Sequence, residues 1–107
     1  MTKRVKTGQK KHDEAVLRSV KWYEGRGYKV NADLPDYNKP KNIGGYVPDL
    51  IAKKDKKEII LEVETKNTNE LDKEQQETFK EYSERGKGRI FKKKLIWCFK
   101  CNYLIIT

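Results

Sequence analysis

The segment from Val47 to Lys66 constrains the fold of this 107-residue chain more than any other part of it. It predicts two strands joined by a lysine-rich turn at residues 53–57. If the hairpin turns at Asp55-Lys56, Glu62 lies directly opposite Asp49 on the neighbouring strand. We therefore expect two carboxylates side by side at the end of an otherwise apolar hairpin.

The second strand of this hairpin places charged residues on one face, because side chains alternate between faces along a strand. The charged face holds Glu58, Ile60, Glu62, Glu64 and Lys66, and the opposite face holds Ile59, Leu61, Val63 and Thr65. Neighbouring like charges are costly unless a cation or a proton relieves their repulsion. Mg²⁺ takes one or two carboxylates together with water and phosphate oxygens. The pattern fits a metal site, and it fits solvated glutamates on an exposed strand face equally well.

The rest of the chain predicts a single α/β domain of order α-β-β-β-α-β-β, which is a small mixed sheet flanked by helices. Helices are expected at residues 12–24 and 70–84, where apolar residues recur at helical spacing. Residues 35–45 are rich in turn formers and have almost nothing to bury, so they predict a loop that could close over the carboxylates. Strands are expected at residues 28–34, 47–52, 59–66, 95–99 and 103–106.

Charge is distributed unevenly along the chain. The formal net charge is +9, from 25 Lys and Arg against 16 Asp and Glu, with basic ends and an acidic middle. A phosphate backbone would be drawn to the ends. Residues 1–11 are expected to form a basic, flexible arm that either contacts nucleic acid or only solubilises the chain. The candidate nucleic-acid contacts are Lys3, Arg4, Lys6, Lys10, Lys11, Lys92, Lys93 and Lys94.

Two other kinds of protein are disfavoured. Cys98 and Cys101 form a lone Cys-x-x-Cys pair, and zinc needs four ligands, whereas His12 is the single histidine. We therefore expect free thiols. No apolar run is long enough to span a bilayer, and no signal-peptide core follows the basic start. These absences predict a cytoplasmic protein without membrane contact.

The element order, with Pro48-Asp49 on one strand and a Glu-x-Lys-like tripeptide on the next, resembles the PD-(D/E)xK nuclease superfamily. Within that superfamily the archaeal Holliday-junction resolvases look most similar, over roughly residues 8–84. The resemblance implies an αβββαβ restriction-endonuclease-like core. It also implies a metal-dependent endonuclease that acts on DNA with Mg²⁺, or Mn²⁺ in its place, as a two-fold homodimer.

The resemblance assigns roles to individual residues. Asp49 and Glu62, with the carbonyl of Val63, would bind Mg²⁺. Glu14 on the first helix would contribute through water or at a second metal. A metal held in this way would activate water and clamp the phosphate of a phosphodiester.

The lysine of the family motif falls on Glu64 in this chain, as in some restriction enzymes of the superfamily. A second register takes Glu64-Thr65-Lys66 as the Glu-x-Lys motif, and both registers share one strand face. A lysine there would stabilise charge or orient the water, whereas a glutamate would act as a base or a metal ligand. Gln75 resembles a glutamine used by some members near the site, although its place at the edge of a helical stripe explains it more simply.

Three functions therefore compete. The leading one is a Mg²⁺-dependent DNA endonuclease, either resolving branched DNA or cutting in a restriction or repair role. The alternative is a nucleic-acid-binding module on the same fold that has lost catalysis. A third is an interaction protein whose acidic strand binds a basic partner, which the basic ends disfavour.

Overall fold

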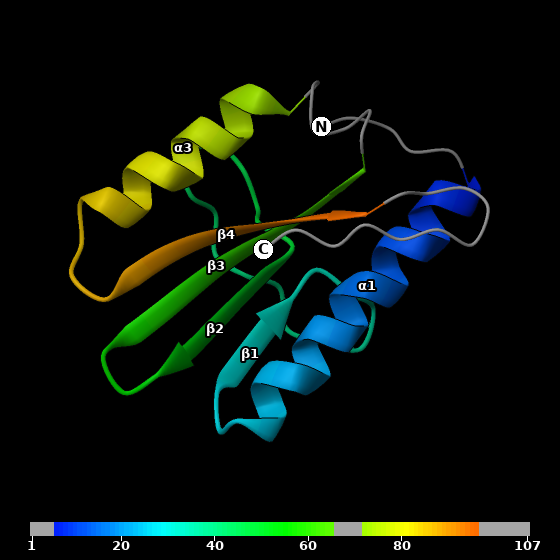
Figure 1. Cartoon of the computed structure of the whole chain (residues 1–107), viewed down its shortest axis with the longest axis horizontal. Helices are drawn as coiled ribbons and strands as arrows, with labels where there is room; N and C mark the ends of the chain where they lie inside the picture. The colour runs from blue at the N-terminus through cyan, green and yellow to red at the C-terminus, as the bar shows by residue number, and fades with distance from the viewer. Residues whose placement is uncertain (1–5, 66–71, 97–107) are drawn as a thin grey trace.

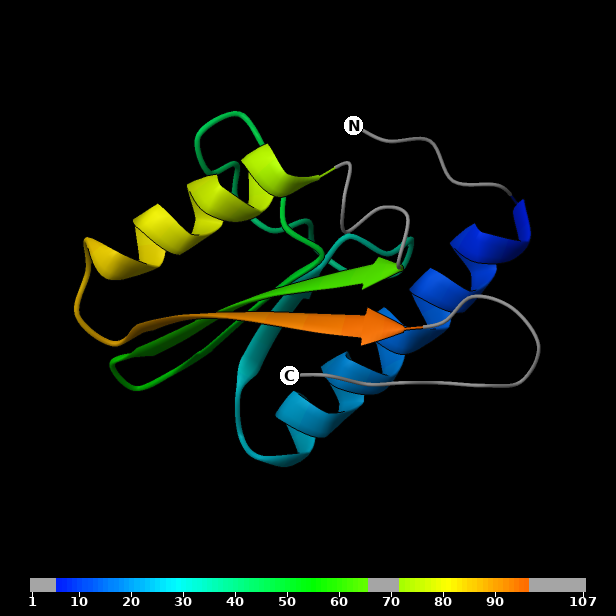
Figure 2. The ribbon, with the colours of Figure 1, turned by 45° about the horizontal axis from the view of Figure 1, so that its top comes forward.

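The computed structural model describes residues 6–65 and 72–96. Within them, two helices enclose a four-stranded sheet in three layers (Figures 1 and 2). This confirms the predicted α/β class and the mixed sheet. No helix in these ranges is both long and apolar enough to cross a membrane. In chain order the elements are α1 (Lys6–Gly25), β1 (Lys29–Ala32), β2 (Leu50–Lys54), β3 (Lys57–Thr65), α3 (Lys73–Glu84) and β4 (Arg89–Ile96).

The strands lie side by side in the order β1-β2-β3-β4. The first three are antiparallel, and β4 is parallel to β3 because α3 carries the chain back across the sheet. In the β2–β3 hairpin, Lys54 pairs with Lys57 and Leu50 pairs with Leu61, so the predicted turn at Asp55-Lys56 is confirmed. Asp55 takes a φ of 53°, a left-handed conformation that Asp tolerates better than most residues.

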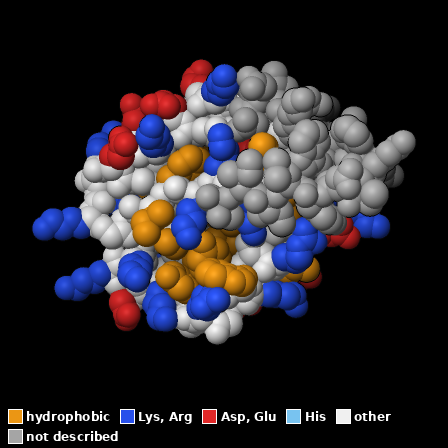
Figure 3. All heavy atoms as spheres, in the orientation of Figure 1, with side chains coloured by type: hydrophobic (Ala, Val, Ile, Leu, Met, Phe, Trp, Pro, Cys, Tyr) orange, Lys and Arg blue, Asp and Glu red, His pale blue; other side chains and the backbone are white. Residues whose placement is uncertain are grey.

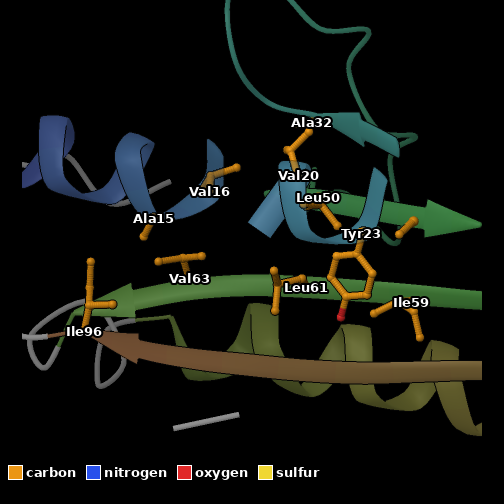
Figure 4. Close-up of a cluster of buried hydrophobic side chains, with 11 residues drawn as sticks. Ala15, Val16, Val20, Tyr23, Ala32, Leu50, Ile59, Leu61, Val63 and Ile96 are labelled. Atoms are coloured by element: carbon orange, nitrogen blue, oxygen red, sulfur yellow. The ribbon is translucent and has the colours of Figure 1, made fainter. Parts of the chain in front are cut away.

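Strand β3 is buried on both faces, and its alternation follows the prediction. Ile59, Leu61 and Val63 face α1, where they pack among side chains such as Val16 and Val20 (Figure 4). The intervening residues face α3, where Ile60 packs with Ile51 and Phe79. Each such side chain contributes about 1.5–3 kcal/mol when fully buried. The two cores fix the register of β3, because a one-residue slip would exchange its two faces.

Helix α1 begins at Lys6 rather than at the predicted His12. Residues 6–11 are therefore the first turns of a helix, which corrects the prediction of a flexible arm over residues 1–11; residues 1–5 lie outside the described ranges. The basic run carries no apolar stripe that would have marked it as helical. The buried face of α1 is formed by His12, Ala15, Val16, Ser19, Val20 and Tyr23.

Strand β4 also begins earlier than predicted, at Arg89 rather than Leu95. Lysines at 92–94 hid the strand pattern, because their long stems can lie along a sheet while the ammonium groups reach water. Ile96 is only 1% exposed and packs in the α1 core. The strand expected at 103–106 and both cysteines lie outside the described residues.

The loop at residues 35–45 buries an apolar side chain, although its sequence predicts that it has almost nothing to bury. Ile43 is buried against Ile51, Ile60 and Phe79, and it forms a short antiparallel bridge with Tyr46. The hydroxyl of Tyr46 then donates a hydrogen bond to Glu74 of α3. This end of the loop therefore packs on α3.

Glu58 joins the sheet, the loop and α3 at one end of β3. Its carboxylate accepts a 2.8 Å hydrogen bond from the Tyr82 hydroxyl and lies 3.1 Å from Nζ of Lys41 and 3.4 Å from Nε of Arg89. Burial alone would raise the pKa of Glu58, but the Tyr82 hydrogen bond and the Lys41 ammonium bring it below its ordinary value of 4.5. Ionised Glu58 therefore stabilises the fold above pH 4.5, and this contribution is lost as the pH falls through the depressed pKa.

Replacing Glu58 with glutamine should lower the free energy of unfolding at pH 7 by about 1.5–3 kcal/mol, because a neutral amide cannot pair with the surrounding cations. Urea unfolding of wild type and Glu58→Gln at pH 7 and near pH 3 measures this. The difference should shrink at the lower pH, and Glu84→Gln, an exposed control on α3, should change little. An equal loss at both pH values would contradict the electrostatic explanation.

Candidate active site

Two carboxylates accept backbone hydrogen bonds at the point where the pairing between β2 and β3 ends. The backbone N–H of Asp49, just before β2, donates a 2.7 Å hydrogen bond to Oε2 of Glu62. The backbone N–H of Val63 donates a 2.8 Å hydrogen bond to Oδ2 of Asp49. Glu62 thus accepts from the backbone N–H of Asp49, and Asp49 accepts from the backbone N–H of the residue that follows Glu62. We call this arrangement the carboxylate bracket. The bracket brings Asp49 and Glu62 together as the hairpin register predicts.

The bracket is buried, which excludes the alternative of solvated glutamates on an exposed strand face. Asp49 is 9% exposed, Glu62 is 2% exposed, and Glu64 on the same face as Glu62 is fully buried. The carbonyl of Asp49 accepts a 2.9 Å hydrogen bond from the N–H of Asp33, so the backbone is held from the β1 side as well. Three acids in so small a space need compensation.

The two acids of the bracket respond to burial in opposite ways. Burial raises the pKa of Glu62, and the negative charge of Asp49 raises it further, to well above its ordinary value of 4.5. Burial also acts to raise the pKa of Asp49, but the His12 ring and the N–H of Val63 outweigh it and bring that pKa below its ordinary value. Asp49 therefore carries the negative charge, while Glu62 keeps its proton to higher pH.

Helix α1 contributes His12 to the site, and sequence reasoning missed it. Nε2 of His12 lies 3.1 Å from Oδ2 of Asp49, and its Nδ1 lies 3.1 Å from Oδ1 of Asp13. The signal was available, because His12 precedes Val16 and Val20 at helical spacing and so shares their buried face. A histidine between two carboxylates fixes the orientation of Asp49.

Glu14, the helical acid that the family resemblance implies, does not share this face. It is exposed and lines a separate groove with Leu34 and Tyr37. The structure therefore brings His12, and not Glu14, to the carboxylate bracket. Helical geometry explains the difference, because residues two apart point away from each other.

Helix α3 contributes Gln75, whose Nε2 donates a hydrogen bond to Oε1 of Glu62. Its place on the buried stripe was predicted, and the contact with Glu62 gives it more than a packing role. Lys93 of β4 lies beside Glu62 in the parallel register, and its ammonium donates a 3.2 Å hydrogen bond to Oε1 of Gln76. Lys66, the other candidate lysine, lies outside the described residues.

The predicted DNA-contacting lysines divide among several surfaces. Strand alternation puts Lys93 on the α3 face and Lys92 and Lys94 on the α1 face. Lys10 is exposed on α1 and Lys11 is half-buried there. Lys3 and Arg4 lie outside the described residues, as does the Lys6 side chain.

The donor set suits a hard cation. Within residues 6–65 and 72–96, no group of three or more His, Cys, Asp or Glu side chains is arranged to hold a metal ion. The bracket nevertheless offers two buried carboxylates whose repulsion a cation would relieve, and Mg²⁺ commonly takes one or two carboxylates with water and phosphate oxygens. Asp49 and Glu62 would be its protein ligands, and the Val63 carbonyl stays a predicted third.

An αβββαβ chain with facing acids at the end of the β2–β3 hairpin has the arrangement of a restriction-endonuclease-like protein. The REase_AHJR-like family model, whose name denotes restriction-endonuclease-like proteins of the archaeal Holliday-junction resolvase type, matches residues 5–90. The chain belongs to this nuclease family, and the match includes the carboxylate bracket, His12 and Gln75. No curated protein and no solved structure matches the chain.

Glu62→Gln should stabilise the protein in EDTA at pH 8, because it removes a buried acid whose raised pKa makes the fold lose stability as the pH rises above 4.5. A gain of about 1 kcal/mol would raise the melting temperature by roughly 4–8 °C. Thermal unfolding at pH 8 and near pH 4.5 measures it, and the gain should shrink at the lower pH. Glu77→Gln, exposed on α3, is the control, and a destabilised Glu62→Gln protein would show that the carboxyl group serves the fold.

Proposed function

We propose that this protein is a Mg²⁺-dependent endonuclease that hydrolyses phosphodiester bonds in DNA, with a preference for branched DNA such as a Holliday junction, and that it acts as a homodimer. The observation that carries the proposal is the buried carboxylate bracket in a chain of the REase_AHJR-like family. The family supports a nuclease and a DNA substrate. The metal dependence, the branched substrate and the dimer are our proposal.

The bracket has the properties that such chemistry needs. Bound Mg²⁺ would supply a water of lowered pKa and neutralise charge on the phosphate. His12 orients Asp49 from α1, and Gln75 holds Glu62 from α3, so that the two acids keep their mutual position without bound substrate. Such supporting contacts commonly change metal affinity or activity by about 10- to 100-fold.

Cleavage of labelled four-way junction, flap and duplex DNA with Mg²⁺, Mn²⁺ or EDTA tests the proposal. We expect cleavage with either metal and none in EDTA. Asp49→Asn and Glu62→Gln should each lose about 100-fold or more, since a direct ligand matters at least as much as its supports. Both should also weaken Mn²⁺ binding in calorimetry. Glu14→Gln, on the exposed face of α1, should stay near wild type, and cleavage that persists in EDTA would overturn the metal dependence.

Two lysines could supply positive charge at the phosphate. Lys66 follows Glu64 by two residues, as in the second motif register, and Lys93 lies beside Glu62 on the neighbouring strand. We expect Lys66→Met to reduce cleavage less than Glu62→Gln does, and we expect Lys93→Met to reduce it more than Lys80→Met, an exposed control on α3. An inactive Lys66→Met protein beside an active Glu62→Gln protein would assign the motif to Glu64 and Lys66 instead.

A DNA-binding module without catalysis is the second candidate. It is favoured by Glu64 at the position of the motif lysine. Such a protein would bind DNA with an affinity that falls steeply as the salt concentration rises. In a plot of the logarithm of the binding constant against the logarithm of the salt concentration, each phosphate contact contributes about 0.9 to the slope. It would give no cleavage with Mg²⁺ or Mn²⁺.

A further inference from the structure

A groove of about 420 Å³ runs between α1 and the outer strand β4, apart from the carboxylate bracket. Leu61 of β3 and the side chains of Ser19 and Tyr23 form its floor and wall, and its charged residues are Arg18, Lys92 and Lys94. No Asp or Glu is among the described residues that line it. The groove therefore concentrates positive charge in a partly enclosed space, where charge acts more strongly than on an open surface.

Lys94 is a half-buried cation of this groove. Its ammonium donates a 2.7 Å hydrogen bond to Oγ of Ser19, whose own hydroxyl donates to the carbonyl of Ala15. Burial lowers the pKa of Lys94, and the positive charges of Arg18 and Lys92 lower it further. Two cations beside a half-buried ammonium oppose folding, and a bound anion would compensate all three charges.

Trp22 lines the groove with half of its surface exposed. The guanidinium of Arg26 lies 4.1 Å from the centroid of its ring, and Tyr23 packs edge-on against it. The indole face thus already accepts a flat cationic group. In the orientation of Figure 1, the space-filling view likewise shows hydrophobic side chains bordered by Lys and Arg (Figure 3).

The position of the groove relative to the bracket bears on the substrate. Leu61 lines the groove and the next residue, Glu62, belongs to the bracket, so the two sites lie on opposite faces of β3. Lys92 and Lys93 divide between the same two faces on β4. DNA whose strands separate near the cut could place one strand on each face.

We propose that this groove binds an unpaired DNA segment, with phosphates on Arg18, Lys92 and Lys94 and a base stacked on Trp22. Cationic grooves combined with exposed aromatic rings are the usual means of holding single strands, because every base has a face to stack while its phosphates track the charge. The inference rests on the proposed function, since it takes DNA as the substrate. It adds that the substrate carries unpaired nucleotides.

Fluorescence titration of the full chain in EDTA tests the groove without requiring cleavage. The chain has two tryptophans, so Trp97→Phe leaves Trp22 as the only indole reporter. Adding an oligodeoxythymidylate of about 10 nucleotides should quench this fluorescence, whereas a blunt duplex should quench it much less. Trp22→Ala should weaken binding of the single strand by roughly 5- to 100-fold, and Trp22→Phe should retain part of the affinity.

Matched variants separate stacking from charge. Leu17→Ala removes an exposed apolar side chain of α1 that does not line the groove, and it should leave single-strand affinity unchanged. Lys94→Met should weaken single-strand binding and leave the melting temperature equal or higher, because it removes a half-buried cation. Lys21→Met, an exposed lysine of α1, should lower affinity only slightly.

Trp22→Ala and Lys94→Met proteins that bind the single strand as wild type does would overturn the proposal, even if the protein cleaves duplex DNA with Mg²⁺. If these two variants change self-association but keep the oligonucleotide affinity of wild type, the groove is an interface between two copies of the chain. That result would also overturn the proposal. Failure of the proposed function has a different signature, which is the lack of metal-dependent cleavage of junction, flap and duplex DNA. Single-strand binding that depends on Trp22 supports the proposal whether or not cleavage occurs.

Discussion

The two hydrogen bonds of the carboxylate bracket, from the N–H of Asp49 to Glu62 and from the N–H of Val63 to Asp49, are the constraint on which the rest of the site depends. Where the main-chain ladder between β2 and β3 stops, two side chains accept the N–H groups that a longer strand would have satisfied. Buried N–H groups without acceptors are costly, so the acids help to complete the sheet while remaining available at its end. Burial acts to raise the pKa of both acids, and the pair becomes unequal because the His12 ring and the N–H of Val63 lower the pKa of Asp49 while the charge of Asp49 raises that of Glu62. Structure and chemistry here use the same atoms.

Much of this arrangement could be predicted from the sequence. The turn position fixed the pairing of Asp49 with Glu62, because a hairpin register needs only the location of its turn. Alternation along β3 divided Ile60 from Leu61 correctly, since each face packs against a different helix. The mixed sheet followed from the element order. These correct predictions depend on contacts between residues near in sequence, or on the strict alternation of side chains between the two faces of a strand.

The wrong or missing predictions arise where long-range packing determines which residues are buried, or where long polar side chains conceal a helix or a strand. His12 reaches Asp49 only because α1 crosses the end of the hairpin, which no local pattern specifies. The lysines of β4 concealed a strand that pairs with β3 along its length, and the basic start of α1 concealed the first turns of a helix. Ile43 was assigned to an unburied loop because its burial depends on Phe79, far along the chain. For His12 and Ile43, the deciding neighbours are Asp49 and Phe79, which lie far away in the sequence.

The hydrogen bonds of the carboxylate bracket would influence both the affinity and the exchange rate of any cation that binds there. Oδ2 of Asp49 and Oε2 of Glu62 are already occupied by backbone N–H groups, and Gln75 occupies Oε1 of Glu62. An arriving ion would use the remaining lone pairs of these oxygens or displace hydrogen bonds that the protein supplies from within. Each hydrogen bond that the ion displaces would diminish the observed ion affinity by the stability that this bond contributes. Loosening a single amide contact, even one far from the phosphate, would be enough to change how readily the ion enters and leaves.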